Sequence, residues 1–160
     1  MKLDLATVRE LLTEYHYDRR NRVYDFMTQL RPEEFVRDVH AGWGSIRTTL
    51  LHCLEAEEFW VGYAVQQQAR PDFDPADYPN VAAIRALADK VRRQTESFVA
   101  RLTEADMARE CAITYSSGTR VTFPMAKMFL HVITHDTHHR GQALVLARQM
   151  GYEPPEIDLM

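Results

Sequence analysis

Four stretches of this chain repeat apolar residues at intervals of three and four, and this periodicity restricts the fold more than any other feature. The stretches cover about residues 5 to 30, 46 to 65, 81 to 102 and 124 to 150, and Pro32 ends the first. Apolar residues at these intervals lie on one face of an α-helix, and that face must be buried against other helices. We therefore expect an all-α fold, a four-helix bundle.

The ends of two of these helices are marked by residues with known preferences. Ser45 precedes the second helix and suits its N-cap, where a hydroxyl accepts a hydrogen bond from a free backbone N–H. Pro124 suits the first turn of the fourth helix, and Gly151 suits its C-terminal stop. The segment "CAITYSSGTRVTF" before Pro124 has β-favouring runs on both sides of a Ser-Ser-Gly turn, so we expect a short hairpin or an irregular insert there.

Composition and charge narrow the class of protein. The chain has 160 residues, 46% of them hydrophobic, which suits one domain over residues 1–160 with a core of its own. The formal net charge is -4 and no Lys/Arg run appears, which argues against nucleic acid as a partner. We find no signal-peptide pattern and no apolar run of transmembrane length. With only two cysteines, we expect a cytoplasmic protein that does not associate with a membrane.

Four of the seven histidines lie within "HVITHDTHHRGQ", residues 131 to 142. His135 and His139 are four residues apart, so they share a face of the fourth helix and can each offer a ring nitrogen to one metal ion. His52, on the second helix, is the outstanding candidate for a third ligand. Three such ligands leave coordination positions open, which is typical of a catalytic metal. The alternative is that the pair lies on a solvated face and that His52 is an ordinary, partly buried residue.

Two carboxylates near these histidines have several interpretations. Glu55 follows His52 by three residues, so the two share a helix face. It is a candidate fourth ligand or a candidate acid–base group, but we favour an exposed helix carboxylate. Asp136 completes the string His-Asp-x-x-His, which is similar to the His-Glu-x-x-His helix of zinc proteases. The aspartate is shorter and nothing around it adds a protease signal, so we do not favour that chemistry.

Four further residues near the motif have open roles. His131 lies one turn before His135, either as a hydrogen-bond partner of a ligand or as a polar core residue, and we favour the core. His138 is one helical step from the pair and is expected to point elsewhere. Arg140 is a candidate for binding a substrate carboxylate, or for a salt bridge at the surface or between subunits. We expect Trp43 in the core rather than in a pocket wall.

The chain resembles the DinB/YfiT-like family of four-helix-bundle metalloproteins, and three segments carry the resemblance. "GSIRTTLLHCLEAEEFW" is similar to the family's second helix, with its histidine at His52. "HVITHDTHHRGQ" is similar to the fourth-helix motif, in which a His-x-x-x-His pair precedes Arg-Gly-Gln. "LLTEYHYDRRNRVYDFMTQL" is similar to the first helix, so the resemblance covers nearly the whole chain.

The resemblance implies a three-histidine site for divalent zinc, nickel, manganese or iron, formed by His52, His135 and His139, and it implies a homodimer. Characterised family members include transferases and isomerases that use low-molecular-weight thiols such as bacillithiol, mycothiol or glutathione. We therefore expect a metal-dependent enzyme with a small-molecule substrate, a thiol-dependent S-transferase or a related transferase, isomerase or hydrolase. The alternative is a non-catalytic stress-response protein whose metal joins the second and fourth helices as a structural staple.

Overall fold

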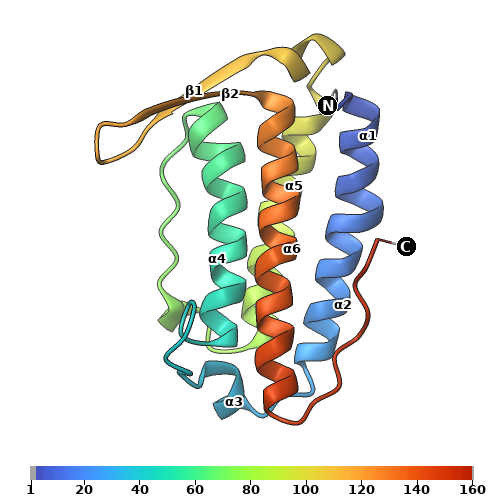
Figure 1. Cartoon of the computed structure of the whole chain (residues 1–160), viewed down its shortest axis with the longest axis vertical. Helices are drawn as coiled ribbons and strands as arrows, with labels where there is room; N and C mark the ends of the chain where they lie inside the picture. Colours follow the sequence, from blue (N-terminus) through green and yellow to red (C-terminus); the bar gives the residue numbers. More distant parts are fainter. Residues whose placement is uncertain (1–2, 160) are drawn as a thin grey trace.

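The computed structural model describes residues 3–159, and its first helical segment runs along most of the length of the molecule (Figure 1). The segment consists of α1 (Leu5–Glu10), the π-helical stretch η1 (Leu11–Tyr17) and α2 (Asp18–Met27). Asp4 caps its start by accepting a hydrogen bond from the backbone N–H of Thr7 at 2.8 Å. The segment ends earlier than expected. Pro32 begins a separate short helix, α3 (Pro32–Val36), because proline fits the first helical position.

The next two long helical segments are joined by an extended connection. They are α4 (Ile46–Glu58), with its π-helical continuation η2 (Phe59–Val65), and α5 (Val81–Ala100). Ser45 caps α4 as expected, since its hydroxyl accepts from the backbone N–H of Thr48 at 3.1 Å. Between the two segments the chain runs back alongside α4 and forms a short 3-10 turn, η3 (Pro75–Asp77) (Figure 1).

A hairpin precedes the last helix, as the sequence predicts. After a 3-10 turn, η4 (Glu104–Ala108), strands β1 (Glu110–Thr114) and β2 (Arg120–Pro124) pair antiparallel, with Cys111 opposite Phe123. Strand β2 leads directly into α6 (Met125–Gln149), so Pro124 is the residue before the helix rather than part of its first turn. Gly151 follows α6 with a φ of +94°, which glycine adopts without strain, and ends the helix as expected.

The long helical segments lie side by side, with α4 packed against both α5 and α6 (Figure 1). Their buried apolar side chains form two clusters. The first lies toward the hairpin and includes Leu12, Val61 and Phe129. The second includes Leu50 and Ile84. The fold is therefore mostly helical with a small two-stranded sheet, and none of the described helices is long and apolar enough to cross a membrane.

A buried charge cluster lies between these apolar clusters along the helices. Its members, each at most 2% exposed, are His16, Arg20, Glu57, Asp136 and Arg140. Arg20 donates to Glu57 over 2.5 Å, and Arg140 lies 2.8 Å from Asp136, so each guanidinium has a carboxylate partner. Burial, followed by the charge of Arg20, lowers the pKa of His16. That ring is therefore neutral at pH 7, and the charges of the cluster balance.

The expectation for Arg140 is wrong. Its side chain is fully buried and donates to the carbonyl of His16 at 3.1 Å, so it lies neither at a surface nor against a ligand. The sequence does contain a signal for this cluster. His16 and Arg20 continue the apolar stripe of Leu12 and Val23 at helical spacing, which places them on the inner face of the first helical segment.

Candidate metal centre

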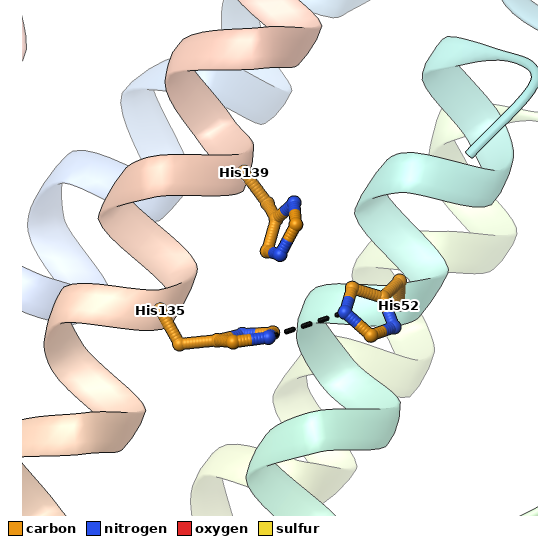
Figure 2. A group of neighbouring side chains, drawn as sticks. All are labelled: His52, His135 and His139. Carbon is orange, nitrogen blue, oxygen red and sulfur yellow. Dashed lines mark hydrogen bonds between the residues drawn. The ribbon is translucent and has the colours of Figure 1, made fainter. Parts of the chain in front are cut away.

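Three histidines from two adjacent helices come together on the side of the molecule where α4 faces α6 (Figure 2). His52 projects from α4, and His135 and His139 project from successive turns of α6. The Nε2 atoms of His52 and His135 are 3.2 Å apart, and one nitrogen from each of the three rings lies within 4.8 Å of the others. The structure therefore brings together the three histidines that the sequence singles out, the pair His135 and His139 and the more distant His52.

The protonation of these rings suits metal binding. Burial, followed by the charge of His139, lowers the pKa of His52 to about 4, and the same two causes lower the pKa of His135 to about 4. Both imidazoles are neutral at pH 7, so each has one nitrogen with a free electron pair. Two nitrogens bound to one tetrahedral zinc ion would be about 3.3 Å apart. The 3.2 Å between His52 and His135 matches this spacing, and a nitrogen of His139 lies within 4.8 Å of both.

Gln142 orients the third ring from behind. Its amide oxygen accepts a hydrogen bond from Nδ1 of His139 at 2.7 Å, and its amide nitrogen donates to Nε2 of His138 at 3.1 Å. Because Nδ1 carries the proton, Nε2 of His139 is left with the electron pair. Partners of this kind fix the tautomer and orientation of metal-binding histidines. Gln142 belongs to the Arg-Gly-Gln string, but no role for it was predicted from the sequence, although its three-residue spacing from His139 indicates a contact.

Trp43 covers the cluster from the loop between α3 and α4. Its ring stacks on His52 with centroids 3.6 Å apart and planes 19° apart. The ring is 48% exposed, so the expectation of a core residue is wrong. The loop turns sharply here, with positive φ angles at Gly42 and Gly44, and the Thr48 hydroxyl donates to the carbonyl of Trp43. The loop backbone thus presents the indole to the side of α4 that carries His52.

A cavity of about 510 Å³ opens beside the cluster, and we call it the aromatic pocket. Its lining residues are Trp43, His52, Glu55, Ala56, Phe59, Trp60, Arg70, Tyr115, His131 and His135. A second cavity, also of about 510 Å³, lies on the other side of Trp43 and is lined by residues that include His138, Gly141 and Val145. Of these two cavities, the aromatic pocket is the one lined by members of the histidine cluster, His52 and His135, so a substrate would reach a metal there through it.

The remaining candidate residues lie in different surroundings, Glu55 and His131 at the aromatic pocket and Asp136 in the buried charge cluster. Glu55 lines the aromatic pocket and burial raises its pKa, so it is not the freely exposed carboxylate that we favoured. Glu55 is not part of the three-histidine group. His131 lies on the pocket wall with its ring 4.9 Å from Trp60, and the preferred core role for it is wrong. Asp136 is turned inward to Arg140, which explains the absence of a protease-like arrangement.

Comparison with known proteins gives concordant results. The sequence model of the DinB family matches residues 3–160. The protein YizA of Bacillus subtilis strain 168, itself described as uncharacterized, is 27% identical over 141 residues, which are 88% of this chain and 87% of that protein.

Two solved structures show the same fold. A DinB-like protein from Bacillus cereus ATCC 10987 superposes with a TM-score of 0.67 at 19% identity and covers 99% of this chain and 100% of that one. A DinB-like protein from Bacillus subtilis, YjoA, superposes with a TM-score of 0.67 at 17% identity and covers 92% of this chain and 97% of that one.

Proposed function

Because the chain belongs to the DinB family and places three histidine imidazoles beside an open pocket, we propose that it is a divalent-metal-dependent enzyme. We further propose that it transfers a low-molecular-weight thiol to an electrophilic small molecule. The observation that carries this proposal is the convergence of His52, His135 and His139, of which His52 and His135 also line the aromatic pocket. Zinc, nickel, manganese and iron all suit three imidazole ligands.

Each residue of the centre has a task in this proposal. His52, His135 and His139 hold the ion, and Gln142 keeps the tautomer of His139 correct. When bound, such an ion supplies Lewis acidity that favours the deprotonated form of a thiol or water ligand. Trp43 covers His52 and excludes water from one side of the cluster.

The proposed transfer needs a proton acceptor as well. The thiol sulfur forms a bond to the electrophilic carbon, and the leaving group departs from that carbon with the bonding electron pair. The thiol proton must pass to a base in the pocket. Glu55 is the candidate acceptor, because it lines the same pocket and its raised pKa makes it a better base than an ordinary glutamate.

We also assign the fold to the four-helix bundles and infer a homodimer. The side-by-side packing of the long helical segments supports the first assignment, since bundle proteins build metal sites from side chains on facing helices. The exposed apolar side chains of Trp43 and Val145, 48% and 52% exposed, support a contact between copies along α6. Analytical ultracentrifugation of the wild type and of Val145→Asp tests the dimer.

The experiment that tests the proposed activity uses glutathione as the thiol and monobromobimane as the electrophile. Displacement of bromide produces a fluorescent thioether, so the rate above the uncatalysed reaction is read directly. We expect the metal-loaded wild type to accelerate this reaction, and His135→Ala to lose both metal and activity. Retention of full thiol transfer by a His135→Ala protein that has lost its metal would remove the metal from the function.

A structural staple is the competing function, because the three histidines join α4 to α6. It predicts that stripping the metal lowers the melting temperature strongly while no thiol and electrophile are turned over. An added ligand separates the two functions. A catalytic centre loaded with cobalt changes its visible spectrum when azide or a thiol takes an open position, whereas a closed structural centre does not.

A further inference from the structure

The aromatic pocket carries two features that metal binding leaves unexplained. The first is a set of aromatic rings, and the second is a single guanidinium at Arg70. Their combination bears on what the pocket binds, and it rests on the proposed function only in taking this pocket as the substrate site.

The aromatic rings come from separate parts of the chain and meet only in the folded protein. Trp43 belongs to the loop before α4, Phe59 and Trp60 to η2, and Tyr115 to the turn after β1. Edge-to-face contacts hold two of them in place. Phe59 lies 5.3 Å from Trp60, and Trp60 lies 5.4 Å from Phe123 of the hairpin. Fixed rings around a cavity favour a flat apolar ligand, because such a ligand can stack on them with little loss of entropy.

The backbone after η2 delivers Arg70 to this wall. Gln67 adopts a left-handed conformation with φ of +56°, and the N–H of Gln68 donates back to the carbonyl of Gly62 at 3.1 Å. This turn reverses the chain, and the buried Pro71 anchors the segment that follows. As a result the guanidinium of Arg70 lies 5.8 Å from the centre of the Phe59 ring.

The charge of Arg70 is available to a ligand. Within residues 3–159 it forms no ion pair, although Glu55 in the same pocket is close enough for their charges to interact. A guanidinium presents a planar set of N–H donors that matches a carboxylate. The contact of Arg70 with the Phe59 ring is between a charge and an aromatic ring and uses none of these donors in a hydrogen bond.

We propose that the aromatic pocket binds an aromatic carboxylate, with its ring among the four aromatic side chains and its carboxylate on Arg70. The substrate class is thus a planar aromatic acid or an electrophile that carries such a group. Arg70 is the residue that determines specificity for the acid over its neutral analogues.

The intrinsic tryptophan fluorescence of the protein can report ligand binding in this pocket. It contains two tryptophans, Trp43 and Trp60, and both line the pocket, so quenching of intrinsic fluorescence measures binding without a label. We would titrate benzoate and its neutral analogue benzamide into metal-free protein, in which no ion competes for the carboxylate. We expect saturable quenching by benzoate and a weaker effect of benzamide.

Variants of Arg70 test whether its guanidinium binds the carboxylate of the ligand. Arg70→Met should weaken benzoate binding about 10- to 100-fold, the worth of a hydrogen-bonded charge pair, and leave benzamide binding unchanged. Arg70→Lys should recover part of the loss. Arg93→Met removes an exposed arginine on α5, outside the pocket, and should behave as the wild type. Equal affinities for benzoate in the wild type and Arg70→Met would overturn the inference, as would equal affinities for benzoate and benzamide.

The same titration separates this inference from the proposed function. If His135→Ala abolishes metal binding and benzoate still binds in an Arg70-dependent manner, the aromatic-acid site stands whatever the metal does. If metal binds and thiol is transferred while Arg70→Met leaves benzoate unaffected, the function stands and the aromatic-acid site is wrong.

Discussion

Gln142 and Trp43 each hold one of the three imidazoles, Gln142 by a hydrogen bond to His139 and Trp43 by stacking on His52. His135 lacks a comparable polar partner, since its buried Nδ1 atom has none among the described residues. The orientation of the centre therefore depends on packing at His135 and on the amide of Gln142 at His139. Among the residues outside the histidine cluster, Gln142 is therefore the one whose replacement should lower metal affinity most.

We predict that Gln142→Ala weakens metal binding about 10- to 100-fold without preventing folding, because the ring of His139 loses the acceptor that fixes its tautomer. Gln142→Glu keeps an acceptor oxygen and should restore most of the affinity. Gln149→Ala, two turns later on α6, is the matched control. Competition against a chromogenic zinc chelator gives the dissociation constants, and a wild-type constant for Gln142→Ala would contradict the assigned role.

At the scale of elements, α3 and the C-terminal segment are joined by one carboxylate. Glu34 of α3 accepts from the hydroxyl of Tyr152 at 2.6 Å and from the guanidinium of Arg31 at 2.6 Å. The hydrogen bonds from Arg31 and Tyr152 lower the pKa of Glu34 from 4.5 to about 2. The ionised form is thus favoured in the folded state, and the contact depends on pH.

We predict that the stability difference between the wild type and Glu34→Gln is largest above pH 4.5 and disappears as the pH falls toward 2. The sign follows from the lowered pKa, since the folded protein resists protonation that the unfolded chain accepts in this range. Urea unfolding at a series of pH values measures the difference. Glu33→Gln, whose side chain is 69% exposed, serves as the control. A difference that stays constant with pH would show that the charge of Glu34 is not involved.

The elements differ in how far the sequence could predict them. The long helices and the hairpin follow from periodicity, from Ser45 and from Gly151, because these signals are local. The short α3 was missed although Pro32 is a local signal for the start of a helix. The π-helical stretches η1 and η2 could not be predicted, since apolar spacing alone does not distinguish a π-helical turn from an α-helical one. The pairing of His135 with His139 was predictable from spacing, and His52 from its place on the second helix and from the family resemblance. The place of Arg70 depends instead on a chain reversal that brings it back to Phe59.

At the scale of the whole molecule, the buried charge cluster joins helical segments that are distant in sequence. Glu57 on α4 receives hydrogen bonds from Arg20 at 2.5 Å, from Tyr17 at 2.9 Å and from Thr95 of α5 at 2.7 Å. Asp136 and Arg140 extend the cluster to α6, one residue beyond the candidate metal ligands His135 and His139 respectively. The cluster therefore lies directly behind the candidate metal centre and ties its two helices to the rest of the core.

We predict that Arg20→Met destabilises the protein by about 3–5 kcal/mol, because it leaves Glu57 buried without its main counter-charge. The double variant Arg20→Met, Glu57→Gln should lose less than the sum of the single changes. Arg22→Met, two residues later and 54% exposed, removes only a surface pair with Asp18 and should cost less than about 1 kcal/mol. Chemical denaturation gives the free energies of unfolding of Arg20→Met, Glu57→Gln, the double variant and Arg22→Met. Equal losses of stability for Arg20→Met and Arg22→Met would contradict the role of the cluster.

The central claim is that His52 on α4 and the pair on α6 hold one metal ion between them. Elemental analysis of untagged protein, purified without chelator or metal-affinity resin, tests it most directly, with His52→Ala and the exposed His40→Ala measured beside the wild type. We predict about one divalent ion per chain in the wild type and in His40→Ala, and little in His52→Ala. An absence of metal from the wild type, even after reconstitution with zinc, nickel, manganese and iron, would contradict the claim, as would a full complement in His52→Ala.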